Sequence, residues 1–527
     1  MPSAGAETDL GPLSPDTRLT LSAPRTDARV RTNALRSPVG PKAKEIPVPP
    51  TPTDAPLFGW RGLALAAVLS LVLCWPMLLT GQLFVFPDTS SYVRGGAVIW
   101  EVLRDIVGEV FADAPASPGE GEGEGGGNTP TGLTVNDRGS PVVGRSFTYS
   151  AAAYLAQAAG GPLAIAWLQG VVILLMVFAL IGREALARPV LLAAGFAVLA
   201  LLTAWPWYTV YLMPDGFAAV VVIYAMLVAG RFQALGWRQI AVATGLAAFA
   251  VSTHYGYMPL SVVAIGAALC WRLLAGGLRA TTVAVALVPV LAAPLANLGA
   301  SAAVLEEASV TPRRLPILLA RSIQDGPAQW YLEDVCPEAD LTFCRAFGKD
   351  VPTDIRAFLW DEGGVSSLTP EQMNGIRAEE AEILMRAFLA YPVEQTASLL
   401  GNLARQTVMV GTGNIAVTDG MTEGWAWTQA EPETLGRFLL RQADPVVSAS
   451  VLIGAALLLV VLLSGRLDRS QRGMIVALAA GYLGNAAIFG GLSAPVDRYQ
   501  ARIAWLVPLL ALVLFCTLAG ARRRGAD

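Results

Sequence analysis

Two aspartates stand at the ends of long apolar segments, where a carboxylate can act on a hydroxyl group. Asp88 lies in Pro87-Asp-Thr-Ser-Ser-Tyr92, just after the first such segment, and Asp215 stands at the start of another. Ionisable groups near a bilayer are costly to maintain, so they indicate function, most simply as a general base. The structural alternatives are a turn or helix cap for Asp88 and a favourable helix-dipole position for Asp215.

Two arginines are candidates for binding an anion. Arg498 and Arg502 are four residues apart at the start of the last apolar segment, and therefore share one face of a helix. The N-terminus of a helix already favours an anion, so two guanidinium groups there predict a phosphate site at the membrane surface. The alternative is that both side chains snorkel to the lipid headgroups.

Three further side chains, Tyr92, His254 and Tyr499, are candidate substrate-binding residues close to these groups in the sequence pattern. His254 is the only histidine of the chain, which excludes a metal site with several histidine ligands. It could equally hydrogen-bond to neighbouring backbone. No cofactor is predicted with certainty. A divalent metal near Asp215 and His254 stays open.

Membrane helices must position these residues. Of the 527 residues, 54% are hydrophobic and only 15% are charged, whereas soluble domains carry roughly a quarter charged residues. The net charge of −4 gives no reason to expect a nucleic-acid partner. The prediction is an all-α polytopic membrane protein in contact with membrane lipids, with about ten transmembrane helices. The predicted spans lie near residues 60–81, 162–182, 189–208, 214–231, 239–254, 257–275, 281–303, 446–465, 473–492 and 502–520.

The arginines of the short loops predict the orientation of these spans. Basic residues favour the cytoplasmic side, and every basic short loop falls on one side when ten spans alternate. The pattern predicts a bacterial inner-membrane protein with both termini in the cytoplasm. The candidate aspartates, arginines and histidine then all face the external side.

The remaining segments define the domain organisation. The acidic segment between the seventh and eighth spans is predicted to form a mostly helical external domain, with a helix over 370–391 in which apolar residues recur at helical spacing. The predicted parts are a disordered cytoplasmic tail 1–56, a transmembrane module 57–304 with a long first external loop 83–160 containing a Gly-Glu linker 119–127, a periplasmic domain 305–445, three C-terminal spans 446–520 and a basic cytoplasmic tail 521–527.

Two cysteines of the predicted external domain, Cys336 and Cys344, are close in sequence. Outside the bacterial cytoplasm such a pair usually oxidises, so a disulfide is predicted. A structural zinc site is the alternative, but it needs four ligands and no histidine is near.

The order of these motifs resembles the GT-C superfamily of membrane glycosyltransferases, which use polyprenyl-phosphate-linked sugars. Members carry a catalytic aspartate in a long external loop directly after the first span, where Asp88 stands, and interfacial helices in that loop, for which 97–111 and 146–159 are candidates. Asp215 matches a second acidic residue in the next external loop. The Asp497-Arg-Tyr499 stretch before Arg502 is similar to a late external loop of several bacterial members.

The resemblance implies that a sugar is transferred from a polyprenyl-phosphate donor to a glycan, glycolipid or protein acceptor of the envelope, with inversion at the sugar. Asp88 would be the base, and Arg498 and Arg502 would hold the phosphate. The chain departs from some members, because no adjacent acidic pair follows Asp88 and its external domain precedes the eighth span rather than following the last one.

Three other functions stay open. An O-antigen ligase-like or flippase-like protein would depend on external arginines and on His254. A non-catalytic envelope scaffold would use the external domain to recruit a partner. A secondary transporter would carry broken helices and charges at mid-membrane, whereas the charges of this chain gather at one surface.

Overall fold

The computed structural model describes residues 59–111, 134–135, 141–143, 145–186, 188–305, 307–348, 351–421 and 427–524. The predicted N-terminal tail 1–56, the Gly-Glu linker 119–127 and the end of the basic tail 521–527 lie outside these residues.

The described chain is mostly helical. Up to the end of α10 its helices are α1 (Trp60–Leu73), α2 (Trp75–Thr80), α3 (Thr89–Phe111), α4 (Phe147–Leu186), α5 (Pro189–Leu202), α6 (Trp205–Val210), α7 (Phe217–Gly230), α8 (Trp237–Ser252), α9 (Tyr257–Leu274) and α10 (Ala280–Leu305). After it come α11 (Ile317–Asp325), α12 (Pro327–Val335), α13 (Thr342–Phe347), α14 (Ile355–Trp360), α15 (Pro370–Ala390), α16 (Pro392–Val408), α17 (Leu435–Leu463), α18 (Arg469–Asn485), α19 (Asp497–Ala504) and α20 (Leu506–Arg524). The tighter or wider turns are η1 (Pro214–Gly216), η2 (Phe232–Ala234), η3 (Val365–Ser367) and the π-helical η4 (Ala486–Gly491).

Two short antiparallel pairs complete the secondary structure. Strand β1 (Leu83–Val85) pairs with β4 (Ala416–Thr418), and β2 (Thr134–Val135) pairs with β3 (Pro141–Val143). The first pair joins the segment after α2 to the segment before α17, although they are far apart in sequence.

Six helices of the described chain are long and apolar enough to cross a membrane, which confirms a multi-pass membrane protein. They cover Phe147–Arg183, Tyr257–Leu274, Ala280–Leu305, Leu435–Leu463, Arg469–Gly491 and Asp497–Ala519.

Three further predicted spans contain apolar helices that are shorter than a bilayer needs, so the count of ten stays a prediction. Proline explains two of the interruptions. The first predicted span divides into α1 and α2, with Pro76 in the first turn of α2, and the third divides into α5 and α6, with Pro206 in the first turn of α6. Proline lacks the N–H that a helix interior requires, so it stands where a new helix begins.

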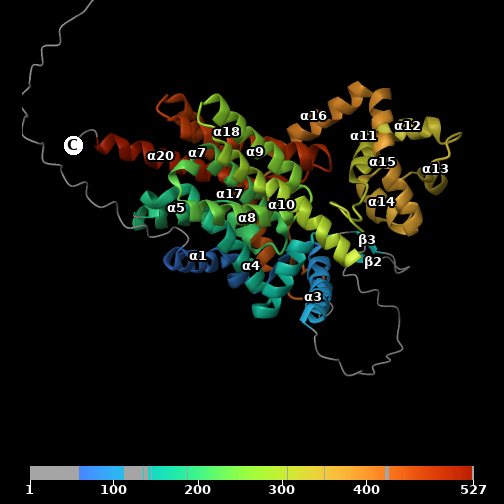
Figure 1. Cartoon of the computed structure of the whole chain (residues 1–527), viewed down its shortest axis with the longest axis horizontal. Helices are drawn as coiled ribbons and strands as arrows, with labels where there is room; N and C mark the ends of the chain where they lie inside the picture. Colours follow the sequence, from blue (N-terminus) through green and yellow to red (C-terminus); the bar gives the residue numbers. More distant parts are fainter. Residues whose placement is uncertain are drawn as a thin grey trace, which may run out of the picture. The chain divides into compact units, whose positions relative to one another are not determined.

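Helix α7 lies at the centre of the bundle, packed against α4, α8, α9 and α18 (Figure 1). All but the last of its residues are buried, which is why it reads as a continuous apolar run. Small residues allow α18 to approach closely. A Cβ on Gly230 would lie 2.4 Å from the Ser470 carbonyl oxygen, and one on Gly481 would lie 2.8 Å from the Val222 side chain. Close approach at glycine is typical of helix contacts in membranes.

Helix α4 is interrupted twice. Gly160 and Gly161 leave helical geometry just before Pro162, and Gly182 does so near the other end, with φ of 76°. The first break separates the predicted helix 146–159 from the membrane-spanning part. The portion of α4 before this break packs against α3, which contains the other helix predicted for this loop, 97–111.

The segment after α10 builds a hydrophobic core of its own from α11 to α15. Helix α15 confirms the helix predicted over 370–391, and it buries Met373, Ile376, Ile383 and Ala387 along one face. Cys336 and Cys344 form a disulfide, which confirms that prediction. The domain limits 305–445 stay a prediction, although α17 begins at Leu435, inside them.

Candidate functional site

An ion pair with almost no solvent access joins two of the predicted residues. The Arg502 Nη1 atom lies 3.1 Å from the Asp215 carboxylate, and the two side chains are 1% and 2% exposed. Asp215 belongs to η1, directly before α7, and Arg502 belongs to α19, so 287 residues separate them. A buried charge requires such a partner.

The π-helical turn η4 completes the surroundings of Arg502. Its Nη2 atom donates to the side-chain oxygen of Asn485, 3.0 Å away, just before η4. The Phe489 ring in η4 lies 3.9 Å from the guanidinium carbon. π-Helical turns occur often at functional sites, and this one directs an amide and an aromatic ring at the same guanidinium.

Asp88 is paired with an arginine that the sequence analysis did not single out. Its Oδ1 atom lies 2.5 Å from Arg145 Nη2, and the two side chains are 22% and 15% exposed, respectively. Asp88 directly precedes α3 and its carbonyl accepts from the Tyr92 N–H, whereas Arg145 lies just before α4. Asp88 and Arg145 are 57 residues apart, so no local sequence pattern predicts their pairing. The only signal was an arginine within the predicted external loop.

Arg498 is held differently from Arg502. Within the described residues no carboxylate lies within ion-pair distance of it. Its guanidinium instead makes long contacts to the hydroxyls of Tyr211 (3.5 Å) and Tyr499 (3.4 Å) and lies 3.9 Å from the Phe86 ring centre. The side chain is nevertheless buried, at 8% exposed. Arg498 is therefore a buried cation without an ion-pair partner among the described residues.

We call Asp88, Arg145, Asp215, Arg498 and Arg502 the Arg–Asp cluster. Both predicted arginines lie near the Tyr499 ring, with guanidinium carbons 4.9 and 5.1 Å from its centre.

The buried Tyr92 hydroxyl is within electrostatic range of Asp88, Arg145, Asp215 and Arg498. Burial raises the pKa of Tyr92, so the phenol stays protonated and can donate a hydrogen bond.

His254 lies in the turn between α8 and α9. Its Nδ1 atom accepts a hydrogen bond from the Gly256 N–H at 3.0 Å, as in the structural alternative, so a neutral ring carries its proton on Nε2. Burial, and then the charges of Arg502, Arg498 and Arg145, lower the pKa of His254 well below its ordinary value. The imidazole is therefore neutral at physiological pH.

Three polar atoms near the cluster are buried without a hydrogen-bond partner among the described residues: Arg145 Nε, Arg502 Nε and the Tyr208 hydroxyl. Tyr208 lies within electrostatic range of Asp215, Arg498 and Arg502. Buried polar groups are normally satisfied, and such exceptions are typical of a site that receives a ligand or water.

The predicted residues therefore lie close together. The two arginines differ in their ion pairing, which the sequence did not show. Arg502 is neutralised by Asp215, whereas Arg498 has no ion-pair partner within the part of the chain that the structure describes. No group of three or more His, Cys, Asp and Glu side chains that could hold a metal occurs within the described parts of the chain.

Comparisons of the chain with protein-family models, curated proteins and solved structures found no match.

Proposed function

We propose that the chain is an integral membrane glycosyltransferase that moves a sugar from a polyprenyl-phosphate donor to an envelope glycan, lipid or protein. The observation that carries the proposal is Arg498, a buried cation that pairs with no described carboxylate and lies within electrostatic range of the Asp88 carboxylate. A phosphate binder and a carboxylate base are the two groups that such a transfer needs.

In the proposed reaction an acceptor hydroxyl oxygen attacks the anomeric carbon of the sugar. Asp88 accepts the hydroxyl proton. The bond from the anomeric carbon to the phosphate oxygen breaks, and its electron pair stays on the lipid phosphate. Arg498 binds that phosphate as negative charge develops on it, an electrostatic role that is often the largest single contribution to catalysis.

Arg145 and Arg502 have positioning roles in this proposal. Arg145 orients the Asp88 carboxylate while leaving it partly exposed to an incoming hydroxyl. Arg502 binds Asp215 across the start of α7 and so holds α19, which carries Arg498, against η1.

The acidic segment after α10 is proposed to position the acceptor. Its α16 is attached to the loop before α19, because Gln406 Nε2 donates to the Val496 carbonyl and Gln406 Oε1 accepts from the Val496 N–H. Val496 stands two residues before Arg498. Movement of α16 on acceptor binding would therefore be transmitted to the phosphate-binding arginine.

The test is a mass-spectrometric profile of envelope glycans and lipid-linked sugars in a host strain that lacks the gene. The strain receives the wild-type chain, Asp88→Asn or Arg498→Gln at matched protein level. Both variants should lack one sugar in the envelope and accumulate its lipid-phosphate form, because loss of a base or of an anion-stabilising donor costs about 10²-fold or more in rate. Matched controls are Asp340→Asn and Arg345→Gln, which disrupt an exposed ion pair.

Wild-type profiles with Asp88→Asn would contradict the proposal and favour a scaffold or a transporter. A wild-type profile with Asp88→Asn together with loss of product in His254→Asn would favour the O-antigen ligase-like alternative. The observation behind that alternative is that His254 lies within electrostatic range of Arg502, Arg498 and Arg145.

A further inference from the structure

A second site lies at the opposite end of α7 from the Arg–Asp cluster. It is a cavity of about 770 Å³ lined by α4, α5, α20 and the segment that follows α7. Asp215 belongs to η1, which directly precedes α7, and Arg231 directly follows α7. Fourteen helical residues at 1.5 Å each place them roughly 20 Å apart, so this cavity is separate from the cluster.

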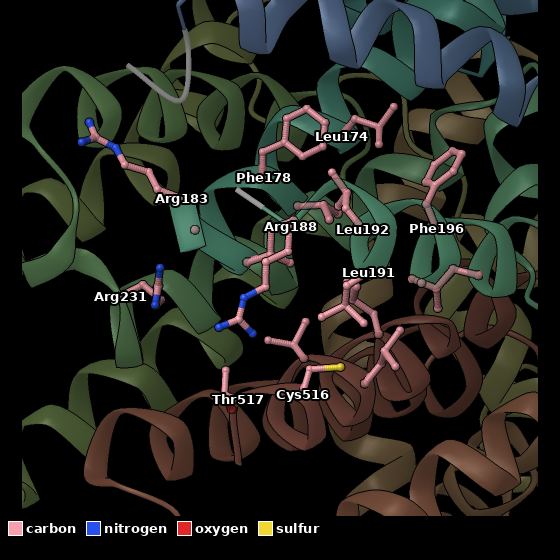
Figure 2. Close-up of a pocket in the computed structure, with 18 of the residues that line it drawn as sticks. Leu174, Phe178, Arg183, Arg188, Leu191, Leu192, Phe196, Arg231, Cys516 and Thr517 are labelled. Carbon is pink, nitrogen blue, oxygen red and sulfur yellow. The ribbon is translucent and has the colours of Figure 1, made fainter. Parts of the chain in front are cut away.

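The wall of the cavity is mostly apolar. Leu174, Phe178, Leu192 and Phe196 are among the lining residues, and Figure 2 shows them on one side of the pocket. A cavity of this size and character fits hydrocarbon chains rather than a free polar molecule.

Arginine side chains stand at the other side of the same cavity. Arg183, Arg188 and Arg231 line it, and Figure 2 shows the Arg188 guanidinium toward Thr517, with Arg231 on the same side of the view as Arg183 and with Arg183 directed away from both. No carboxylate occurs among the described lining residues. The cavity therefore has an apolar end and a cationic end.

The local backbone is shaped around Arg231. At Gly182 the chain leaves helical geometry with φ of 76°, and a Cβ there would lie 1.9 Å from Arg231 Nη2. Any larger residue would displace this guanidinium. Arg231 Nε is also buried without a hydrogen-bond partner among the described residues. These two observations indicate an arginine that is fitted into the cavity and can still bind a ligand.

We infer that this cavity binds an anionic phospholipid, with its phosphate on Arg188 and Arg231 and an acyl chain against the apolar wall. Guanidinium groups match phosphate oxygens in bidentate geometry. Free phosphate would use only the cationic end, whereas a zwitterionic lipid would bring a second cation to the arginines. The basic loops that border the cavity suit the leaflet where anionic lipids are enriched.

The experiment is native mass spectrometry of the full-length protein in detergent, titrated with phosphatidylglycerol or with phosphatidylcholine of the same chains. The wild-type chain should retain phosphatidylglycerol preferentially. Arg231→Gln and Arg188→Gln should each lower its apparent affinity by roughly fivefold, the effect expected for one basic residue near an anionic lipid. The matched control is Arg238→Gln in the first turn of α8, just after the same loop, where Arg238 is exposed and lies over Trp237.

Equal retention of the two lipids by the wild-type chain would overturn the inference, as would unchanged phosphatidylglycerol binding in both variants. Displacement of the lipid by millimolar inorganic phosphate would show that the cavity recognises phosphate alone, against the proposed lipid. If Arg231→Gln fails to fold, Arg231→Lys and Arg188→Gln still provide the test. Lysine keeps the charge but loses the bidentate geometry, so an intermediate affinity is expected.

Discussion

Asp215 and Arg502 show how a charge is tolerated inside this protein. Each has the other as its partner, and Asn485 occupies a second donor of the guanidinium. The arrangement differs at Arg498, which rests on aromatic rings and tyrosine hydroxyls. Two arginines on one helix face therefore have different surroundings, and only Arg502 forms an ion pair among the described residues.

Removal of one partner from the buried pair should destabilise the protein strongly. Arg502→Met leaves the Asp215 carboxylate buried without its counter-ion, which costs about 3–5 kcal/mol. The double variant Asp215→Leu with Arg502→Met removes both charges and should recover most of that loss. Thermal unfolding of the purified protein measures both. A double variant as unstable as Arg502→Met would show that the pair is not the cause.

The lowered pKa of His254 leads us to expect that stability depends on pH. Its folded-state pKa is lowered below the ordinary value of 6.5, so below pH 6.5 the unfolded chain binds a proton that the folded chain does not. Stability is therefore retained above pH 6.5 and lost as the pH falls toward the folded-state pKa, by up to about 1.4 kcal/mol per pH unit. Unfolding temperatures at pH 7.5, 6.5 and 5.5 should fall more steeply for the wild-type chain than for His254→Asn. Parallel curves would contradict the assignment.

Among the elements, α7 and α18 form a contact that depends on residue size. Two glycines of this contact, Gly230 and Gly481, have no room for a side chain. Association of helices in a bilayer depends on close packing rather than on the hydrophobic effect, so a single methyl group matters there.

Two alanine substitutions should differ in their effect on the unfolding temperature. Gly230→Ala places a Cβ 2.4 Å from the Ser470 carbonyl oxygen, so the helices must separate and the unfolding temperature should fall. Gly245→Ala on α8 meets nothing within 4 Å and should be neutral or stabilising, because alanine is the better helix former by up to about 1 kcal/mol. Equal unfolding temperatures for the two variants would contradict the packing argument.

At the scale of the whole molecule, segments far apart in the chain close on the Arg–Asp cluster. Strand β4 pairs with β1, which ends three residues before Asp88. Helix α16 is hydrogen-bonded through Gln406 to the loop before α19. The acidic segment after α10 is in this way connected to the polar site rather than tethered independently.

The predicted orientation can be tested by labelling single cysteines with a membrane-impermeant maleimide. Asp340→Cys lies at an exposed position of the acidic segment, and Arg466→Cys lies in the loop between α17 and α18. Both are made in a chain whose free cysteines Cys74, Cys270 and Cys516 are replaced by alanine. The first should react in intact spheroplasts and the second only after lysis. Equal reactivity without lysis would contradict the predicted topology.

The sequence by itself determined the membrane class, the disulfide and the helix over 370–391. Each depends on local order: apolar runs of bilayer length, two cysteines eight residues apart, and apolar residues at helical spacing. It also selected most residues of the polar site, because charged residues at the ends of apolar runs are unusual in any membrane protein.

Only the tertiary structure decided which charges neutralise each other. Asp88 takes Arg145, 57 residues away, and Asp215 takes Arg502, 287 residues away. Such pairing follows from how helices pack, and no local pattern encodes it. The interruption of α4 at Gly182 and the position of Arg231 against it also follow from helix packing and have no local sequence pattern. The cost of a buried charge requires a partner, but the fold alone selects that partner, and it leaves Arg498 without a carboxylate partner among the described residues.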